Sequence, residues 1–178
     1  IAQNPGFTVS YQNYYKIVNN TRTNEVLILY CSASAPNVSG IPNAKYFQVP
    51  VKNVASLDLP TLTFLELMNV HSSLKYVSNT ANITSPCLQK NVVGNTLQEF
   101  NWSVTNVDII FLDPTQTNNT SNDNRTVAIN LGNDLTPRQK LEWIKFYSLF
   151  FDKEATVNPI INQLSYVYDC DSKNLANI

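Results

Sequence analysis

The sequence has few charged residues, one histidine and no long apolar run. Charged residues make up 14% of its 178 residues, well below the ~25% of ordinary globular proteins. The net charge is −1 and Lys and Arg never cluster, which argues against the basic surface of a nucleic-acid binder. No segment reaches the ~18 to 20 consecutive apolar residues of a membrane helix, so we expect no membrane span.

Patterns for catalysis and metal binding are also missing. The only histidine, His71, follows a predicted helix, where a cation would suit the helix dipole. No G-x-S-x-G motif or glycine-rich phosphate loop occurs. Asp108 and Asp113 flank a predicted strand, and a strand-end Asp can bind magnesium or phosphate, but no phosphate loop accompanies them. One histidine and three dispersed cysteines do not form a standard transition-metal set. We therefore expect no enzyme activity, no metal and no cofactor.

Asparagine, rather than charged residues, supplies much of the polarity of the chain. The chain contains 25 Asn, 15 Thr and 14 Ser, and the N-x-Ser/Thr pattern of N-glycosylation occurs seven times. A shuffled chain of this composition would hold roughly four such triplets, so the excess is modest, but most of them fall in predicted loops. We expect an extracellular, N-glycosylated protein whose start, IAQNPG, is a mature end after removal of a signal peptide. The candidate sites are Asn19, Asn37, Asn82, Asn101, Asn118, Asn119 and Asn124.

The three cysteines, Cys31, Cys87 and Cys170, match no zinc or redox motif. In a secreted chain cysteines tend to pair. Because the number is odd, either one thiol is free or its partner lies in sequence not present here.

The longest helical signal runs from Leu135 to Tyr168. Thr136, Pro137 and Gln139 form a helix start with a capping box, and Pro159 predicts a kink or break near Asn158. Glu142 and Lys145 are spaced as an exposed ion pair. The apolar residues recur at helical spacing over a wide face, which indicates a buried helix rather than an aromatic stacking platform: Leu141, Trp143, Ile144, Phe146, Tyr147, Phe150 and Phe151.

The rest of the chain predicts strands that alternate with helices. The pattern indicates an α/β fold with a largely parallel sheet flanked by helices, an N-terminal β-hairpin and a long C-terminal helix. We predict strands over residues 7–18, 25–31, 45–51, 75–77, 106–112 and 127–131, a helix over 58–70 capped by Asp58, and a short helix opening at 84–90.

The order of these segments resembles the N-terminal lobe of periplasmic solute-binding proteins of the cobalamin and ferric-siderophore type. NVDIIFLD stands where that family has a Pro-Asp-Leu-Val strand, and LEWIKFYSLFFDKE is similar to the start of the helix that joins the two lobes in one branch of the family. The stretches LYCSASAPN and TSPCLQK add a likeness to the secreted versions that fungi carry. The resemblance spans about residues 14–169, and its motifs are structural rather than catalytic.

The resemblance implies an α/β lobe over residues 1–134, a connecting helix over 135–170 and a tail over 171–178. Family members hold their ligand between two lobes, and no second lobe follows here. Either a longer protein carries it, in which case Cys170 could pair downstream, or the chain is a single-lobe relative. The implied ancestral function is capture of a small ligand such as a metal chelate or corrinoid. The alternative is an extracellular protein that self-assembles into a filament or surface coat.

Ligands of open parallel sheets approach the carboxyl ends of the strands. Cys31 follows one predicted strand and TSPCLQK follows another. If these strands are neighbours, a Cys31–Cys87 disulfide could tie two loops of the site together. The loop from Ser32 to Pro42 is then a candidate wall of the site, although a plain connecting loop explains it equally well. The candidate ligand-binding residues are Ser32, Ser34, Pro36, Ser85 and Pro86.

Overall fold

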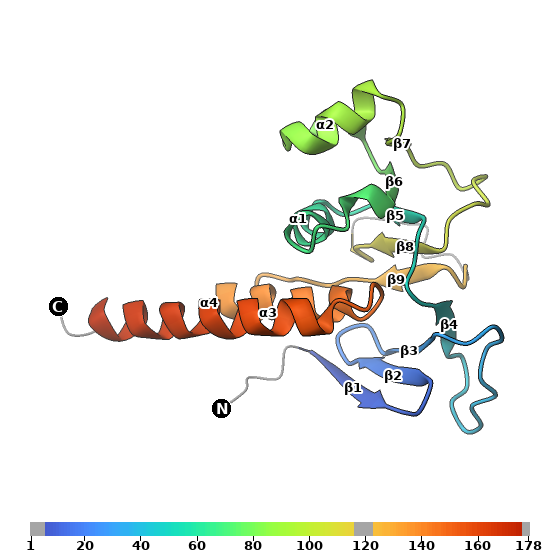
Figure 1. The fold of residues 1–178 in the computed structure, drawn as a ribbon, viewed down its shortest axis with the longest axis horizontal. Helices are drawn as coiled ribbons and strands as arrows, with labels where there is room; N and C mark the ends of the chain where they lie inside the picture. Colours follow the sequence, from blue (N-terminus) through green and yellow to red (C-terminus); the bar gives the residue numbers. More distant parts are fainter. Residues whose placement is uncertain (1–5, 116–122, 176–178) are drawn as a thin grey trace.

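The computed structural model describes residues 6–115 and 123–175 and shows a mixed α/β fold built on two sheets (Figure 1). The predicted parallel sheet with flanking helices is confirmed. The strands are β1 Phe7–Tyr11, β2 Tyr15–Asn20, β3 Glu25–Tyr30, β4 Lys45–Gln48, β5 Val54–Ser56, β6 Leu74–Val77, β7 Gln98–Glu99, β8 Ile109–Leu112 and β9 Thr126–Ala128. The helices are α1 Leu59–Leu67, η1 His71–Ser73, η2 Thr80–Asn82, α2 Pro86–Val93, α3 Pro137–Ser148 and α4 Glu154–Leu175.

The N-terminal strands form a sheet of their own, in the order β1-β2-β3-β4. β1, β2 and β3 pair antiparallel, and β4 joins β3 in parallel. The predicted strand over residues 7–18 is therefore two strands, because the chain turns at Gln12–Tyr14, where the Gln12 amide donates to the Tyr15 carbonyl at 2.9 Å. We had expected a hairpin that leads into the parallel sheet, but its strands belong to this separate sheet.

The second sheet is fully parallel, in the order β7-β6-β5-β8-β9. Its central strand, β5, escaped the sequence analysis because it has three residues, too few to show a periodicity. The four residues of β8 are all buried, as expected for a parallel strand covered on both faces. Because all its strands are parallel, their carboxyl ends lie at the same edge of this sheet.

Side chains from the first sheet cover the free edge of β9 and join the two sheets. The Glu25 carboxylate accepts from the Ala128 amide at 2.8 Å, and the Asn20 amide donates to the Ala128 carbonyl at 2.9 Å. Lys45 pairs with Glu25 at 2.6 Å and donates to the Thr126 carbonyl at 2.8 Å. An edge strand with unpaired backbone groups would otherwise be open to other chains.

The predicted long helix over 135–170 is two helices, α3 and α4, which fold back on each other. The break lies at residues 149–153, before Pro159, which α4 accommodates in its second turn. Asp152 has a positive φ of 52°, and the Lys153 amide donates to the Ser148 carbonyl at 3.0 Å. Many helices end in this way, with one residue in the left-handed conformation, and that residue is usually Gly. Arg138 at the start of α3 pairs with Asp169 of α4 at 2.5 Å, which shows that the two helices run antiparallel.

The aromatic face of α3 lies between the two sheets and is core, as predicted. Trp143, Phe146 and Tyr147 of α3 and Phe150, just after its end, are all fully buried. On one side, Phe7 of β1 contacts the rings of Trp143 and Phe146, with centroids 5.5 and 5.3 Å apart. On the other side, Phe111 of β8 contacts Tyr147 and Phe150 at 5.1 and 5.4 Å. α3 therefore fixes both sheets, while α4 projects beyond them (Figure 1).

Candidate functional site

A pocket of about 320 Å³ lies at the carboxyl ends of β5, β8 and β9. We call it the strand-end pocket. In open parallel sheets this edge is where loops and helix starts converge on a ligand, and the volume is near the lower end of the range for small-molecule sites. Its lining is largely polar: Asp58, Pro60, Asp113, Thr115, Ile129, Asn130, Leu131, Gly132 and Asn133.

Asp58 enters the pocket because it caps α1 directly after β5. Its carboxylate accepts from the Thr61 amide at 3.1 Å, as the helix cap requires, and from the Thr61 hydroxyl at 2.8 Å. The Thr61 hydroxyl also lies 2.7 Å from the Tyr147 hydroxyl. Because Thr61 has one proton to donate, an ionised Asp58 makes Tyr147 the donor to Thr61. The three side chains thus form one chain of hydrogen bonds that runs from the pocket into the core.

Burial controls the ionisation of this chain. Asp58 is 5% exposed, and removal of its carboxyl from water raises its pKa from 3.8 to about 6, with a smaller contribution from the charge of Asp113. Burial likewise raises the pKa of Tyr147 well above its usual value. Tyr147 is therefore a neutral hydrogen-bond donor at physiological pH. Asp58 titrates only slightly below physiological pH.

Asp113 brings a second carboxylate to the pocket from the end of β8. It accepts from the amide and the hydroxyl of Thr115 at 2.8 and 2.7 Å, which holds the start of the following loop. The segment after β9 turns tightly at Gly132, where a Cβ atom would come within 2.6 Å of an Asp134 oxygen. Asp134 itself pairs with Arg22 at 2.8 Å. Asp58 and Asp113 are the two carboxylates among the described residues that line the pocket.

This lining favours a ligand that donates hydrogen bonds or carries positive charge. The two carboxylates accept hydrogen bonds and repel an anion, whereas the amides of Asn130 and Asn133 and the Thr115 hydroxyl can both donate and accept. The lining contains neither cysteine nor histidine nor lysine, but Asp58, whose pKa is about 6, can exchange a proton near neutral pH.

The ligand residues suggested by the sequence lie elsewhere. Ser32, Ser34 and Pro36 belong to the loop between β3 and β4, and Ser85 and Pro86 begin α2, at the opposite end of the molecule (Figure 1). Pro36 is buried, Ser32 donates to the Ser34 carbonyl, and Ser85 caps α2 and donates to Glu66. For Ser32, Ser34 and Pro36 the prediction had placed the strand before Cys31 in the parallel sheet, whereas β3 belongs to the other sheet. Ser85 and Pro86 do follow β6 of the parallel sheet, and ligand binding by them stays a prediction.

The three cysteines lie on separate parts of the fold. Cys31 follows β3 of the first sheet, Cys87 lies on α2 and Cys170 on α4, and all three are exposed and unpaired in the structure. The strands that precede Cys31 and Cys87 are not neighbours. The structure therefore does not form the predicted Cys31–Cys87 disulfide.

Five of the seven candidate glycosylation sites fall on described residues, and all five side chains are exposed. They are spread over both sheets and their loops: Asn19 on β2, Asn37 between β3 and β4, Asn82 in η2, Asn101 after β7 and Asn124 before β9. Asn118 and Asn119 lie outside the described residues. Each of the five is thus accessible to a glycosylating enzyme.

The remaining candidates lie away from the strand-end pocket. His71 is in η1. Asp108 precedes β8, so it lies at the end of that strand opposite Asp113, and it accepts from the amides of Lys52 and Asn53 at 2.8 Å each. It helps to line a second hollow of about 400 Å³ beside β4. Lys145 pairs with Glu142 at 2.6 Å on α3, as its spacing predicted.

Within residues 6–115 and 123–175, no three His, Cys, Asp or Glu side chains gather closely enough to hold a metal ion. No helix in this part of the chain combines the length and the hydrophobicity needed to cross a membrane.

The sequence analysis predicted Asp58 as a helix cap and Asp113 as a strand-end carboxylate, but it did not predict that the two line the same pocket. The signal was present, since both follow short apolar strands at their carboxyl ends. Recognition of residues 54–56 as the central strand was the missing step. Comparison with known protein families finds no match to the chain, and comparison with curated proteins finds no similar sequence.

Proposed function

We propose that this protein is an extracellular, non-catalytic glycoprotein that captures a small ligand at the strand-end pocket. The observation that carries the proposal is the convergence of three parallel strand ends on one polar pocket that includes the buried Asp58. A solute-binding-protein-like lobe, which the order of the sequence segments resembles, would use this edge. The five exposed Asn residues of the glycosylation motifs support an extracellular location.

The chemistry of the pocket narrows the ligand class. Asp58 and Asp113 favour a ligand with amide or amine donors or a positive charge, and disfavour anionic chelates. Corrinoids carry amide side chains, and ferric hydroxamates are neutral or cationic, so both fit this rule. The volume of about 320 Å³ admits only part of such a ligand. One lobe would therefore supply half of a site.

Calorimetric titration of the full chain with cyanocobalamin and with a ferric trihydroxamate tests the proposal. We expect binding of one probe, weakened at least tenfold by Asp113→Asn because an acceptor carboxylate is lost. Glu99→Gln, on β7 at the far edge of the sheet, is the matched control and should bind like the wild type. Absence of binding by both probes, or binding that Asp113→Asn leaves unchanged, would reject ligand capture at this pocket.

The alternative function, self-assembly of an extracellular structural protein, has one observation in its favour. Several large apolar side chains on α4 are exposed: Ile160, Leu164, Tyr166, Val167 and Tyr168. Exposed apolar residues that form a contiguous patch usually mark a contact surface.

A further inference from the structure

Asp58 is a buried carboxylate for which the described chain supplies no positive partner. It is 5% exposed, and none of the ion pairs among the described residues includes it. The nearby charge that acts on it, that of Asp113, is also negative. Buried charges in proteins are paired, because an unpaired charge is costly to remove from water. Asp58 therefore either holds a proton or takes a cation from outside the chain.

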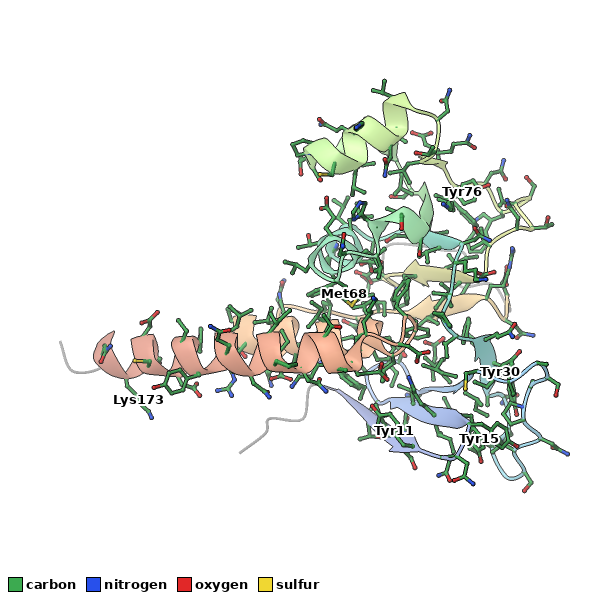
Figure 2. The ribbon with its side chains drawn as sticks, viewed as in Figure 1. Tyr11, Tyr15, Tyr30, Met68, Tyr76 and Lys173 are labelled. Atoms are coloured by element: carbon green, nitrogen blue, oxygen red, sulfur yellow. The ribbon has the colours of Figure 1, made fainter. Side chains whose placement is uncertain are left out.

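The hydrogen bonds of Asp58 leave room for a further donor. Thr61 donates to its carboxylate through the amide at 3.1 Å and the hydroxyl at 2.8 Å. An ionised carboxylate has about four acceptor positions, so acceptor capacity remains for a group in the pocket. The packing of α1 on α3 holds this arrangement in place. The Phe64 ring lies 5.0 Å from that of Tyr147, and Met68, at the end of α1, is buried on the side of α1 that faces α3 and α4 (Figure 2).

The rest of the strand-end pocket suits an ammonium group on an aliphatic chain. Asp113 brings a second carboxylate from the end of β8, and three side chains supply apolar surface: Pro60, Ile129 and Leu131. An ammonium group carries three donors and a positive charge, and a methylene stem can lie along apolar side chains. A metal ion fits less well, since no three His, Cys, Asp or Glu side chains of the described ranges gather closely enough to hold one.

We propose that the strand-end pocket binds its ligand through an aliphatic ammonium group that pairs with the ionised Asp58. This inference rests on the proposed function, because it names the part of the ligand that the pocket holds. The ammonium group supplies the positive partner that the described chain lacks, and a proton held by Asp58 passes to water as the ligand enters. Tyr147 supports the ionised form, because it donates to Thr61 while Thr61 donates to Asp58.

Asp113 and Tyr147 are the other titratable groups that face Asp58. Asp113 comes from the end of β8 and acts on Asp58 through its charge. Tyr147 comes from α3 and stays neutral, because burial raises its pKa well above the usual value. The segment after β9 lines the pocket with neutral amides, and beyond them Asp134 pairs with Arg22. Protonation of Asp58 at acid pH therefore removes the charge that the ammonium group needs.

Calorimetric titration of the full chain with a matched pair of ligands tests the ammonium group. One ligand is a ferric trihydroxamate with a free ammonium group, and the other is the same chelate with that amine acetylated. At about pH 7.5 the wild type should bind the ammonium form at least tenfold more tightly, whereas Asp58→Asn should bind both forms alike. Glu99→Gln, on β7, should keep the wild-type preference. Equal affinities of the wild type for the two forms would overturn ammonium recognition but leave ligand capture standing.

Butylammonium chloride, with butanol as its neutral counterpart, separates the ammonium site from capture of a chelate. Binding of butylammonium that Asp58→Asn abolishes supports the ammonium site, even where neither chelate binds and capture of chelates is rejected. A wild type that binds neither butylammonium nor either chelate overturns both proposals.

The pH dependence of binding is a second readout. Burial raises the pKa of Asp58 to about 6, so the affinity of the wild type for the ammonium chelate should fall about tenfold per pH unit below about 6 and level off above about 7. Asp58→Asn should show no such fall. Asp113→Asn should bind more weakly and show the fall at lower pH, because the charge of Asp113 contributes to the raised pKa of Asp58. A wild type that prefers the ammonium form equally at about pH 5 and 7.5 would overturn the pairing with Asp58.

Discussion

Burial of Asp58 opposes the charge that its carboxyl carries in water. Its pKa rises from 3.8 to about 6 in the folded chain, so the folded state holds the proton more tightly than the unfolded chain does. The stability contributed by this group is therefore complete below about pH 4 and is lost as the pH rises through about 6. This change in pKa corresponds to a loss of roughly 3 kcal/mol in the free energy of unfolding as the pH rises from below about 4 to above about 6.

Asp58→Asn should remove this pH dependence. Asparagine can still cap α1 through its side-chain oxygen but does not titrate, so the free energy of unfolding should stay nearly flat between about pH 4 and 7. At pH 7 the variant should equal or exceed the wild type in stability, because no buried charge remains. Urea unfolding at several pH values measures both effects. Glu99→Gln should retain the wild-type slope, and an equally steep slope in Asp58→Asn would contradict the assignment.

At the scale of secondary-structure elements, the sequence predicted those helices whose ends carry strong local signals. Asp58, Ser85 and Thr136 each cap the helix expected to follow them, because a cap depends on neighbouring residues only. The break between α3 and α4 gave no such signal. Its left-handed residue is Asp152 rather than Gly, and Leu149, Phe150 and Phe151 continue the apolar pattern through the turn. Likewise, only pairing between distant strands shows that β3 and β5 belong to different sheets.

The turn at Asp152 should tolerate asparagine and glycine better than alanine. Its φ of 52° lies in the left-handed region, which costs an ordinary side chain about 1 kcal/mol or more and which Asn, Asp and Gly enter more readily. We expect Asp152→Ala to lower the free energy of unfolding by about 1 kcal/mol more than Asp152→Asn does. Both variants lose the ion pair of Asp152 with Lys16, but Asn keeps an oxygen that can accept from Lys16. Asp152→Gly, which keeps no side chain, should also be more stable than Asp152→Ala and isolates the backbone effect. Equal urea midpoints for Asp152→Ala and Asp152→Gly would show that the turn is not strained.

At the scale of the whole molecule, the described glycosylation motifs lie on both sheets and their loops, and none lies on α3 or α4. After secretion from a eukaryotic host, the described sites Asn19, Asn37, Asn82, Asn101 and Asn124 should carry glycans, since all are exposed. Enzymatic removal of N-glycans should lower the intact mass and convert each occupied Asn to Asp, which peptide mass spectrometry locates. Each site can be removed separately by Asn→Gln as a control. An intact mass that the enzyme leaves unchanged would contradict the extracellular assignment.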